Sequence, residues 1–216
     1  HQVDVIYSDF SKAFDKIDHS LLIMKLECFA FSDELISLIK SYLKDRFMYV
    51  QLNGFKSKQF LQETGVPQGS VLGPLPFNIF INDIVDVVDV HSLLFADDLK
   101  IYSIINSASD SIRLQNNIDK VFDWCSRNNL LINKLKCFVM TFTKKTKPIL
   151  FDYIMGDIVL TRPDTIRDLG ITFDPKMSFA MHIGNITQTA FKSLGFILRN
   201  GREFDDVETL KSLYIA

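Results

Sequence analysis

The feature that most constrains the fold is the order in which strand-like and helix-like segments follow one another. Residues 3–10 form a β-branched and aromatic run typical of a buried strand. Two helical segments follow, one capped by Asp18 and one capped by Ser32, which runs from Asp33 to about residue 44. Asn53-Gly54 then predicts a hairpin between two apolar runs.

The middle of the chain contains a loop, a helix and a second hairpin. Glycine and proline punctuate the loop at residues 65–74, and an apolar helix is expected from there to about Asp89. Pro76 is tolerable in the first helical turn, where the N–H groups have no partner within the helix. Apolar runs on both sides of Asp97-Asp98 predict a tight, buried hairpin with these two acids at its tip.

The last part of the chain changes from strands to helices. Helical periodicity is visible at 109–127, short strands are expected between 130 and 173, and 178–216 is helical with a break near Asn200-Gly201. The whole order predicts an α+β fold, in which helices cover one face of an antiparallel sheet and leave the other free for a substrate. A boundary near Asp174-Pro175 would separate two domains, 1–174 and 175–216.

Composition limits the classes of function. The 216 residues are 47% hydrophobic, enough for a sizeable core, and the net charge of −2 differs from the basic charge usual for nucleic-acid-binding domains. Clustered carboxylates at a metal site would account for that difference. Three widely spaced cysteines predict neither a disulfide framework nor a zinc site, which fits an intracellular protein, and no run of about 18 apolar residues indicates a membrane span.

Three acids are candidates for a metal site. Asp9 ends the first strand, and Asp97 and Asp98 would converge with it if the second hairpin pairs beside that strand. Clustered carboxylates need a neutralising cation, and hard oxygen ligands suit Mg²⁺. Two such ions can hold the attacking and leaving oxygens of a phosphoryl transfer. The simpler alternative is that Asp-Asp is an ordinary choice of turn residues.

Two other segments could bind a ligand. In the loop Gly65–Ser70 the glycines allow close backbone approach, and Gln68 offers both a donor and an acceptor. The alternative is a structural loop before a helix. A basic stretch could follow a phosphate backbone or simply protect a solvated strand edge. Its lysines are Lys134, Lys136, Lys144, Lys145 and Lys147.

Three motifs resemble the reverse transcriptases of non-LTR (LINE-like) retrotransposons. They are YSDFSKAFDKIDH from Tyr7, GVPQGSVLGP from Gly65 and LLFADDLKIY from Leu93, in the order of that family. Weaker similarities cover SYLKDR with VQLNG, WCSRNNLLINKLKC, RDLGITFD and the helix after Ser178. The resemblance implies a polymerase palm at 1–174 and the first helices of a thumb at 175–216.

The resemblance also implies roles for single residues. Asp9, Asp97 and Asp98 would be catalytic metal ligands, joined by the carbonyl of Phe10. Lys136 would donate a proton to the leaving pyrophosphate. The substrate-binding residues would also include the aromatic gate against a ribose 2′-hydroxyl and two residues that contact nucleotide and template. These are Phe14, Gln68 and Gly69.

The implied activity is RNA-directed DNA synthesis. Two Mg²⁺ ions, or Mn²⁺, would assist attack of a primer 3′-hydroxyl on a dNTP, with an RNA template, a DNA primer or target and a nuclear location. No membrane is involved, and the oligomeric state is not indicated. Pro76 departs from the leucine common in the family but is compatible with a first helical turn. Because the fingers would precede the first motif, we expect this chain alone to be a weak or inactive polymerase.

Two alternatives belong to other classes. A nucleotide cyclase could use the same metals, although the Gly65–Ser70 loop and Phe14 argue against it, and its product would be a cyclic nucleotide. A decayed retroelement-derived domain could bind nucleic acid, or have no activity, and its RNA binding would survive Asp97→Ala.

Overall fold

The computed structural model describes residues 1–201 and 206–215 of the chain. The chain divides into two compact units, His1–Arg162 and Pro163–Ala216, and each is described here by itself. This division follows chain contacts and does not show which unit is a palm and which is a thumb. The predicted boundary between palm and thumb at residue 174 therefore stays a prediction.

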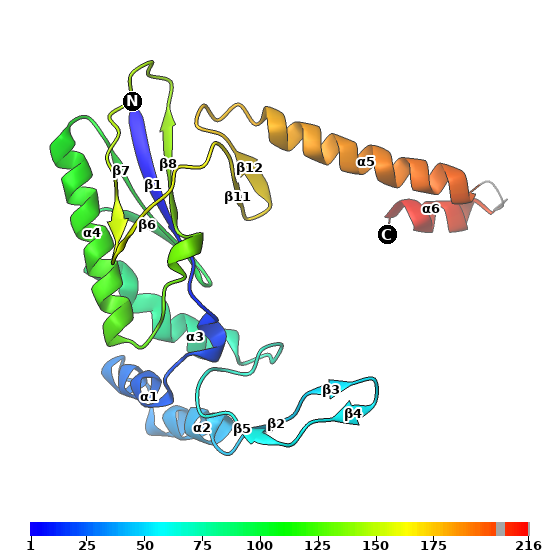
Figure 1. Cartoon of the computed structure of the whole chain (residues 1–216). Coiled ribbons are helices and arrows are strands. Elements are labelled where there is room, and N and C mark those ends of the chain that lie inside the picture. Colours follow the sequence, from blue (N-terminus) through cyan, green and yellow to red (C-terminus); the bar gives the residue numbers. More distant parts are fainter. Residues whose placement is uncertain (202–205, 216) are drawn as a thin grey trace. The chain divides into compact units, whose positions relative to one another are not determined.

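The strands and helices follow one another in the order that the sequence predicts (Figure 1). The described strands are β1 (Gln2–Ser8), β2 (Phe47–Met48), β3 (Gln51–Leu52), β4 (Phe55–Lys56), β5 (Phe60–Leu61), β6 (His91–Phe95), β7 (Asp98–Ile104), β8 (Phe138–Thr143), β9 (Ile154–Met155), β10 (Ile158–Val159), β11 (Ile166–Asp168) and β12 (Ile171–Phe173). The described α-helices are α1 (His19–Cys28), α2 (Asp33–Leu43), α3 (Pro74–Ile81), α4 (Ala108–Arg127), α5 (Ala180–Asn200) and α6 (Val207–Ile215). Short 3₁₀ helices are η1 (Ala13–Asp15), η2 (Asn82–Val87) and η3 (Lys134–Lys136).

The main sheet of the first unit has four strands in the order β6-β7-β1-β8. Each neighbouring pair is antiparallel, and β1 lies in the middle between β7 and β8. Alternate residues of β1 are buried, as expected where one face of a strand lies against the core. The α+β class and the first predicted strand are therefore confirmed.

Helix α4 contacts β7 and carries its own apolar stripe into the core (Figure 1). Ile118 and Val121 of this helix are buried together with Ile6 and Ile101 of the sheet. At about 25 cal/mol per Å² of buried apolar surface, this shared core is the main stabilising contribution to the first unit. It holds β1 and β7 in a fixed register, and both strands lead to the candidate site.

The first two helices begin at the predicted caps. The Asp18 carboxylate accepts hydrogen bonds from the backbone N–H groups of Ser20 and Leu21, at 2.8 and 3.0 Å. The Ser32 hydroxyl accepts one from Leu35 N–H at 3.4 Å. These side chains satisfy N–H groups that have no partner inside the helix.

The helix expected from the 65–74 loop to Asp89 is shorter than predicted. It ends as an α-helix at Ile81 and continues as the 3₁₀ helix η2 to Val87. Pro74 and Pro76 both lie in the first turn of α3, as expected. The change to 3₁₀ geometry tightens the last turns before the chain enters β6.

The hairpin β6–β7 corrects two expectations. Phe95 pairs with Asp98, so Ala96 and Asp97 form the turn and Asp98 is the first residue of β7. The hairpin is also not buried as a whole, because β6 is the edge strand of the sheet and Phe95 is 64% exposed. A continuous apolar sequence looks the same in a buried hairpin and in one with an exposed edge, so the sequence could not distinguish them.

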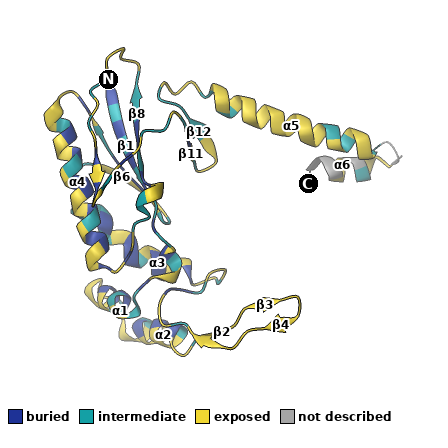
Figure 2. Cartoon of the chain, viewed as in Figure 1, coloured by how far each residue is buried: buried dark blue, intermediate teal, exposed yellow. Residues whose placement is uncertain are grey.

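The Asn53-Gly54 hairpin forms as predicted, and its residues are exposed (Figure 2). Both turn residues have positive φ, 50° and 84°, which is the geometry that Asn-Gly favours. Strands β2 and β5 pair with each other next to β3 and β4 and extend the hairpin. Large apolar side chains such as Phe55, which is 83% exposed, therefore lie on the surface of this hairpin.

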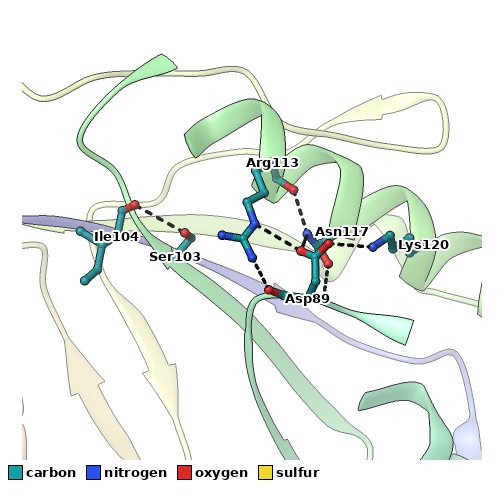
Figure 3. Close-up of polar contacts among 6 residues, drawn as sticks. All are labelled: Asp89, Ser103, Ile104, Arg113, Asn117 and Lys120. Carbon is teal, nitrogen blue, oxygen red and sulfur yellow. Dashed lines mark hydrogen bonds and ion pairs between the residues drawn. The ribbon is translucent and has the colours of Figure 1, made fainter. Parts of the chain in front are cut away.

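A polar cluster fixes the connection between η2 and β6 to helix α4 (Figure 3). The Asp89 carboxylate accepts hydrogen bonds from Asn117 at 2.7 Å and Lys120 at 3.0 Å, and Arg113 donates to the Asp89 carbonyl at 2.6 Å. The hydrogen bond from Asn117 is the largest cause that lowers the pKa of Asp89 from 3.8 to about 2, followed by that from Lys120. The carboxylate therefore remains ionised and paired over the ordinary pH range.

The end of β1 far from Asp9 is fixed by a buried carboxylate. Asp4 is completely buried, and it accepts hydrogen bonds from Gln2 Nε2 at 3.1 Å and from Tyr153 Oη at 2.9 Å. The Arg162 guanidinium lies 4.0 Å from the same carboxylate. Burial raises the pKa of the Tyr153 hydroxyl, which therefore stays a hydrogen-bond donor.

The second unit consists of a hairpin and two helices. Strands β11 and β12 pair with each other, and α5 contacts both β12 and α6. None of the residues of α5 is buried (Figure 2). The predicted helical end of the chain is confirmed, while residues 202–205, next to the predicted break, lie outside the described residues. No helix in the described part of the chain combines the length and apolar character needed to cross a bilayer.

Candidate active site

A cavity of about 530 Å³ lies where β1 ends, within the first unit. This volume is in the range of cavities that bind small ligands. The cavity contains every residue that the sequence assigned to the site except Asp98. Its lining residues are Asp9, Phe10, Lys12, Ala13, Phe14, Pro67, Gln68, Gly69, Gly73, Pro74, Asp97 and Lys136.

Asp9 forms an ion pair with Lys136 inside this cavity. The Lys136 Nζ atom lies 2.9 Å from Asp9 Oδ2, and the side chains are 67% and 28% exposed. The hydrogen bond to Asp9 is the main reason that the pKa of Lys136 is raised above its usual value, and the charge of Asp97 raises it further. Lys136 is therefore a protonated ammonium paired with Asp9.

Backbone contacts explain why residues so far apart in sequence meet here. Asn133 N–H donates to the carbonyl of Asp9 at 2.8 Å, and Ser11 N–H donates to the carbonyl of Leu131 at 2.7 Å. Phe10 forms an isolated bridge with Ile132 between them. The segment before Lys136 is thus fastened to the end of β1 independently of the side-chain ion pair.

The three acids do not assemble as a closed metal cluster. Asp97 lines the cavity with Asp9, but Asp98 is exposed and is not among the lining residues. Ser8 pairs with Leu99, so one further step of this register would place Asp9 opposite Asp98. Like charges at such positions repel one another unless a cation lies between them. The predicted convergence is therefore only partial, and the predicted role of Asp98 stays a prediction.

Phe14 is held in place by ring stacking. Its ring lies 4.1 Å from that of Phe77, centroid to centroid, with an angle of 16° between the planes. Phe77 belongs to α3 and is completely buried. Because one face of Phe14 rests on a fixed ring, its position in the cavity wall is fixed as well.

The 65–74 loop is tied to the segment that follows Asp9. Val66 N–H donates to the Phe14 carbonyl at 2.8 Å, and Gly65 N–H donates to the Ile17 carbonyl at 2.7 Å. His19 Nε2 lies 2.7 Å from the Gly65 carbonyl. Gly65 has a φ of 82°, and an added Cβ would lie 2.6 Å from backbone atoms of Asp15 and Phe14. Glycine is therefore required where the loop crosses this segment.

Gln68 is positioned by a neighbouring acid. Its Nε2 atom donates to the Asp15 carboxylate at 2.9 Å, and the Asp15 carbonyl accepts a hydrogen bond from Thr64. Gly69, next in the loop, has a φ of 78°, and its Cβ position is open. Asp15 thus orients a predicted substrate-binding residue.

Lys12 is a charged cavity residue that the sequence analysis did not assign to the site. It lies between Asp9 and Phe14, both of which were assigned to the site, and this position was the available signal. Its backbone is left-handed, with a φ of 53°, which is uncommon for a lysine. No ion pair of Lys12 is present among the described residues.

The lysines of the basic stretch lie in several different environments. Lys136 lies in the cavity, Lys134 pairs with Asp157, and the remaining three lysines are exposed after β8. Those three are Lys144, Lys145 and Lys147. The stretch is thus not a single surface, and only Lys136 reaches the predicted site.

The oxygen ligands in the cavity suit a hard divalent ion whose coordination shell is completed by a substrate. Within the described residues, no group of three or more His, Cys, Asp and Glu side chains could hold a metal alone. Mg²⁺, however, commonly takes one or two carboxylates and fills its remaining positions with water and substrate phosphates. Asp9 and Asp97 supply such carboxylates, and the Lys136 ammonium against Asp9 Oδ2 indicates that this oxygen can accept a cation.

Comparison with known proteins defines the class. The model of the family described as reverse transcriptase (RNA-dependent DNA polymerase) matches residues 4–198. The chain belongs to this family, whose members generally use divalent metal ions. The match includes all the predicted site residues.

The curated relatives define the type of reverse transcriptase. The chain is 33% identical over 199 residues to the RNA-directed DNA polymerase from mobile element jockey of Drosophila melanogaster, covering 87% of this chain and 21% of the relative. It is 30% identical over 201 residues to the probable RNA-directed DNA polymerase from transposon BS of the same species, covering 88% and 22%. The chain is thus a reverse transcriptase domain of the non-LTR retrotransposon type and spans about a fifth of these relatives.

Solved structures agree on the fold. Apo telomerase from Candida tropicalis, truncated from its C-terminal domain, aligns with a TM-score of 0.57 at 14% identity, covering 80% of this chain and 34% of that one. Telomerase from Candida albicans, in complex with a fragment of telomeric RNA, aligns with a TM-score of 0.55 at 14% identity, covering 82% and 30%. The antiparallel sheet and its helices therefore follow a polymerase fold.

Proposed function

We propose that this chain forms the palm and the first thumb helices of an RNA-directed DNA polymerase of a non-LTR retrotransposon. The reaction is transfer of a nucleotidyl group from a dNTP to the 3′-hydroxyl of a primer. One observation carries the proposal: Asp9, Phe14, Gln68, Asp97 and Lys136 come from four separate parts of the sequence and line one cavity. The palm would be the first predicted domain, 1–174, and the thumb would begin at 175.

Asp9 and Asp97 would hold the metal, assisted by Asp98 and by the carbonyl of Phe10. Two Mg²⁺ ions, or Mn²⁺, would supply the charge that activates the primer hydroxyl and stabilises the leaving pyrophosphate. The protein contributes carboxylates that directly adjoin two paired strands, β1 and β7, whose backbones the core holds in register. This arrangement supports pre-organised electrostatic catalysis, in which the acids need little rearrangement when the substrate arrives.

The nucleotide would lie between Phe14 and the 65–74 loop. Phe14, fixed on Phe77, would occupy the space that a ribose 2′-hydroxyl needs, so that deoxynucleotides are preferred. Gln68, oriented by Asp15, would offer its remaining amide groups to nucleotide or template, and Gly69 would let the strand approach the backbone. These residues select the sugar and the position of the base, while base pairing to the template selects the sequence.

Lys136 would donate a proton to the pyrophosphate that leaves. The acid must be protonated and within reach of the cavity, and the raised pKa beside Asp9 meets the first requirement. Its place in the cavity wall meets the second.

The partners would be an RNA template, a DNA primer or target and dNTPs. The family supports a nucleic-acid substrate, and one telomerase of the same fold was solved with a fragment of telomeric RNA. A nuclear location would follow from use of chromosomal target DNA, and the chain alone would be a weak polymerase or an inactive one.

Single-nucleotide primer extension tests the proposal. The 216-residue chain, in excess over a DNA primer annealed to RNA, is incubated with Mn²⁺ and one dNTP, and both extended primer and cyclic nucleotide are measured. We expect slow addition of one nucleotide that Asp97→Asn reduces at least about 100-fold, as loss of a key charge-stabilising group does. Asp123→Asn, on the exposed surface of α4, is the matched carboxylate control.

A cyclic product would contradict the proposal in favour of a cyclase. Extension that Asp97→Asn leaves unchanged would also contradict it, because the cavity would then not be the reacting site. If no product forms, equilibrium binding of the primer and template, in the presence of Mn²⁺ and the dNTP, is compared in the same variants. Binding unaffected by Asp97→Asn would favour the decayed, non-enzymatic alternative.

A further inference from the structure

The geometry points to Lys136 as a built-in competitor for the metal position on Asp9. We propose that its ammonium must leave Asp9 Oδ2 before a divalent ion can bind there, so that Lys136 lowers the affinity of the empty site for metal. The inference rests on the proposed function, because it concerns the metal of that same site. It assigns Lys136 a role before the chemical step, in addition to proton donation during it.

The first argument is that one oxygen cannot serve both cations. Lys136 Nζ lies 2.9 Å from Asp9 Oδ2, whereas Mg²⁺ binds carboxylate oxygen at about 2.0–2.1 Å. An ammonium and a divalent ion on the same oxygen would repel each other strongly at such separations. Binding of the metal therefore requires the ammonium to move.

The second argument is that the position of Lys136 is built into the backbone. The segment that carries Lys136 is fastened to the end of β1 at two points, by Asn133 N–H on the Asp9 carbonyl and by Ser11 N–H on the Leu131 carbonyl. Lys136 N–H in turn donates to the Asn133 carbonyl at 2.9 Å, which closes the short η3 turn. The backbone therefore keeps the ammonium within reach of Asp9 whether or not the ion pair is formed.

The third argument is that the contact can open at small cost. The Lys136 side chain is 67% exposed, so it can leave Asp9 and be solvated without disturbing the core. Exposed ion pairs of this kind are weak. Lys136 is thus a reversible competitor rather than a permanent block, and it neutralises Asp9 while no metal is present.

Metal titration of the wild type and four variants tests the proposal. Mn²⁺ binding to the chain is measured by calorimetry and by the electron paramagnetic resonance signal of free Mn²⁺, without nucleotide. Lys136→Met and Lys136→Gln should bind Mn²⁺ about two- to fivefold more tightly than the wild type, which corresponds to an exposed ion pair. Two substitutions are used because a methionine could itself shield Asp9.

Lys12→Met is the matched control. It removes the same positive charge from the same cavity, but Lys12 makes no ion pair with Asp9. A smaller gain in affinity for Lys12→Met than for the Lys136 variants supports direct competition. Equal gains in Mn²⁺ affinity for the Lys12 and Lys136 variants would overturn the proposal. The gain would then come from the loss of any positive charge in the cavity and not from the contact of Lys136 with Asp9.

The remaining outcomes separate this inference from the proposed function. Wild-type binding that Asp97→Asn abolishes, together with Lys136 variants that bind no more tightly than the wild type, would overturn the inference alone. No Mn²⁺ binding by any of these proteins would overturn it together with the metal site. Circular dichroism of each variant shows whether the fold is retained, as expected for exposed lysines.

Discussion

Strand β1 contains Asp4 and is directly followed by Asp9, and the surroundings of the two aspartates differ. Asp4 is fully buried, and its oxygens receive hydrogen bonds from Gln2 and Tyr153. Asp9, five residues later, lines a cavity, and an exposed lysine is its ion-pair partner. Asp4 thus has a structural role inside the core, whereas Asp9 is accessible to a ligand.

The difference shows how a fold separates stability from function. Asp4 falls on the buried face of β1, where an unsatisfied carboxylate would be costly, and Gln2 of the same strand and the distant Tyr153 satisfy it. Asp9 lies just past the strand, where a cavity replaces packed side chains. A partner that is mobile and charged, such as Lys136, can be exchanged for a ligand, whereas the buried partners of Asp4 cannot.

The largest effect is expected for Asp4→Ala. The substitution removes the buried acceptor of Tyr153 Oη and one of the two acceptors of the Gln2 amide, which keeps the Ile149 carbonyl. We expect a loss of about 3–5 kcal/mol in the free energy of unfolding. Urea denaturation followed by circular dichroism measures it. Asp9→Ala is the companion variant and should change stability by less than about 1 kcal/mol, as exposed ion pairs do. Similar losses in both variants would remove the distinction between the two aspartates.

A smaller effect separates two glycines of the 65–74 loop. Gly65→Ala places a Cβ 2.6 Å from the backbone of Asp15 at a positive φ, and we expect about 3 kcal/mol of destabilisation from strain and clash. Gly69→Ala has the same kind of φ but open space, so only about 1 kcal/mol is expected. Thermal unfolding of the two variants gives the comparison. If both cost the same, the contact between this loop and the end of β1 is not as tight as the distances indicate.

The smallest effect is a pH dependence at Asp89, outside the site. The folded pKa of about 2 lies below the ordinary value of 3.8, so the carboxylate stabilises the fold above pH 3.8, and this stabilisation is lost as the pH falls towards 2. Asp89→Asn should therefore lower the melting temperature slightly at pH 7, and the difference from the wild type should disappear near pH 2. A difference that does not change with pH would mean that the charge of Asp89 is not what holds this connection to α4.

The sequence predicted those parts of the fold that local chemistry decides. Asp18 and Ser32 cap their helices, and Asn53-Gly54 forms its turn, because side chains and backbone preferences at these positions act over a few residues. The hairpin that contains Asp97 was also recognisable from its flanking runs. Seven of the eight residues that the motifs assign to the site line one cavity, while their roles stay predictions.

What the sequence could not predict depends on contacts between distant segments. The exposure of Phe95 follows from the edge position of β6, which no local pattern reveals. Lys134 and Lys136 look alike in the sequence, yet one pairs with Asp157 and the other with Asp9, because the turn of η3 points them to different neighbours. The position of Asp98 outside the cavity lining likewise follows from the strand pairing of the folded sheet.

The most direct test of the central claim is a Mn²⁺ titration followed by NMR of the ¹⁵N-labelled chain. Paramagnetic broadening falls steeply with distance, and Asp4 lies about 17 Å along β1 from Asp9 at about 3.3 Å per residue. We expect the amide signals of Asp9, Phe10 and Asp97 to broaden first, and those near Asp4 last. Asp97→Asn should suppress this order, and Asp123→Asn should preserve it. Broadening that begins elsewhere, or that is uniform along β1, would contradict the assignment of this cavity as the metal site of a reverse transcriptase.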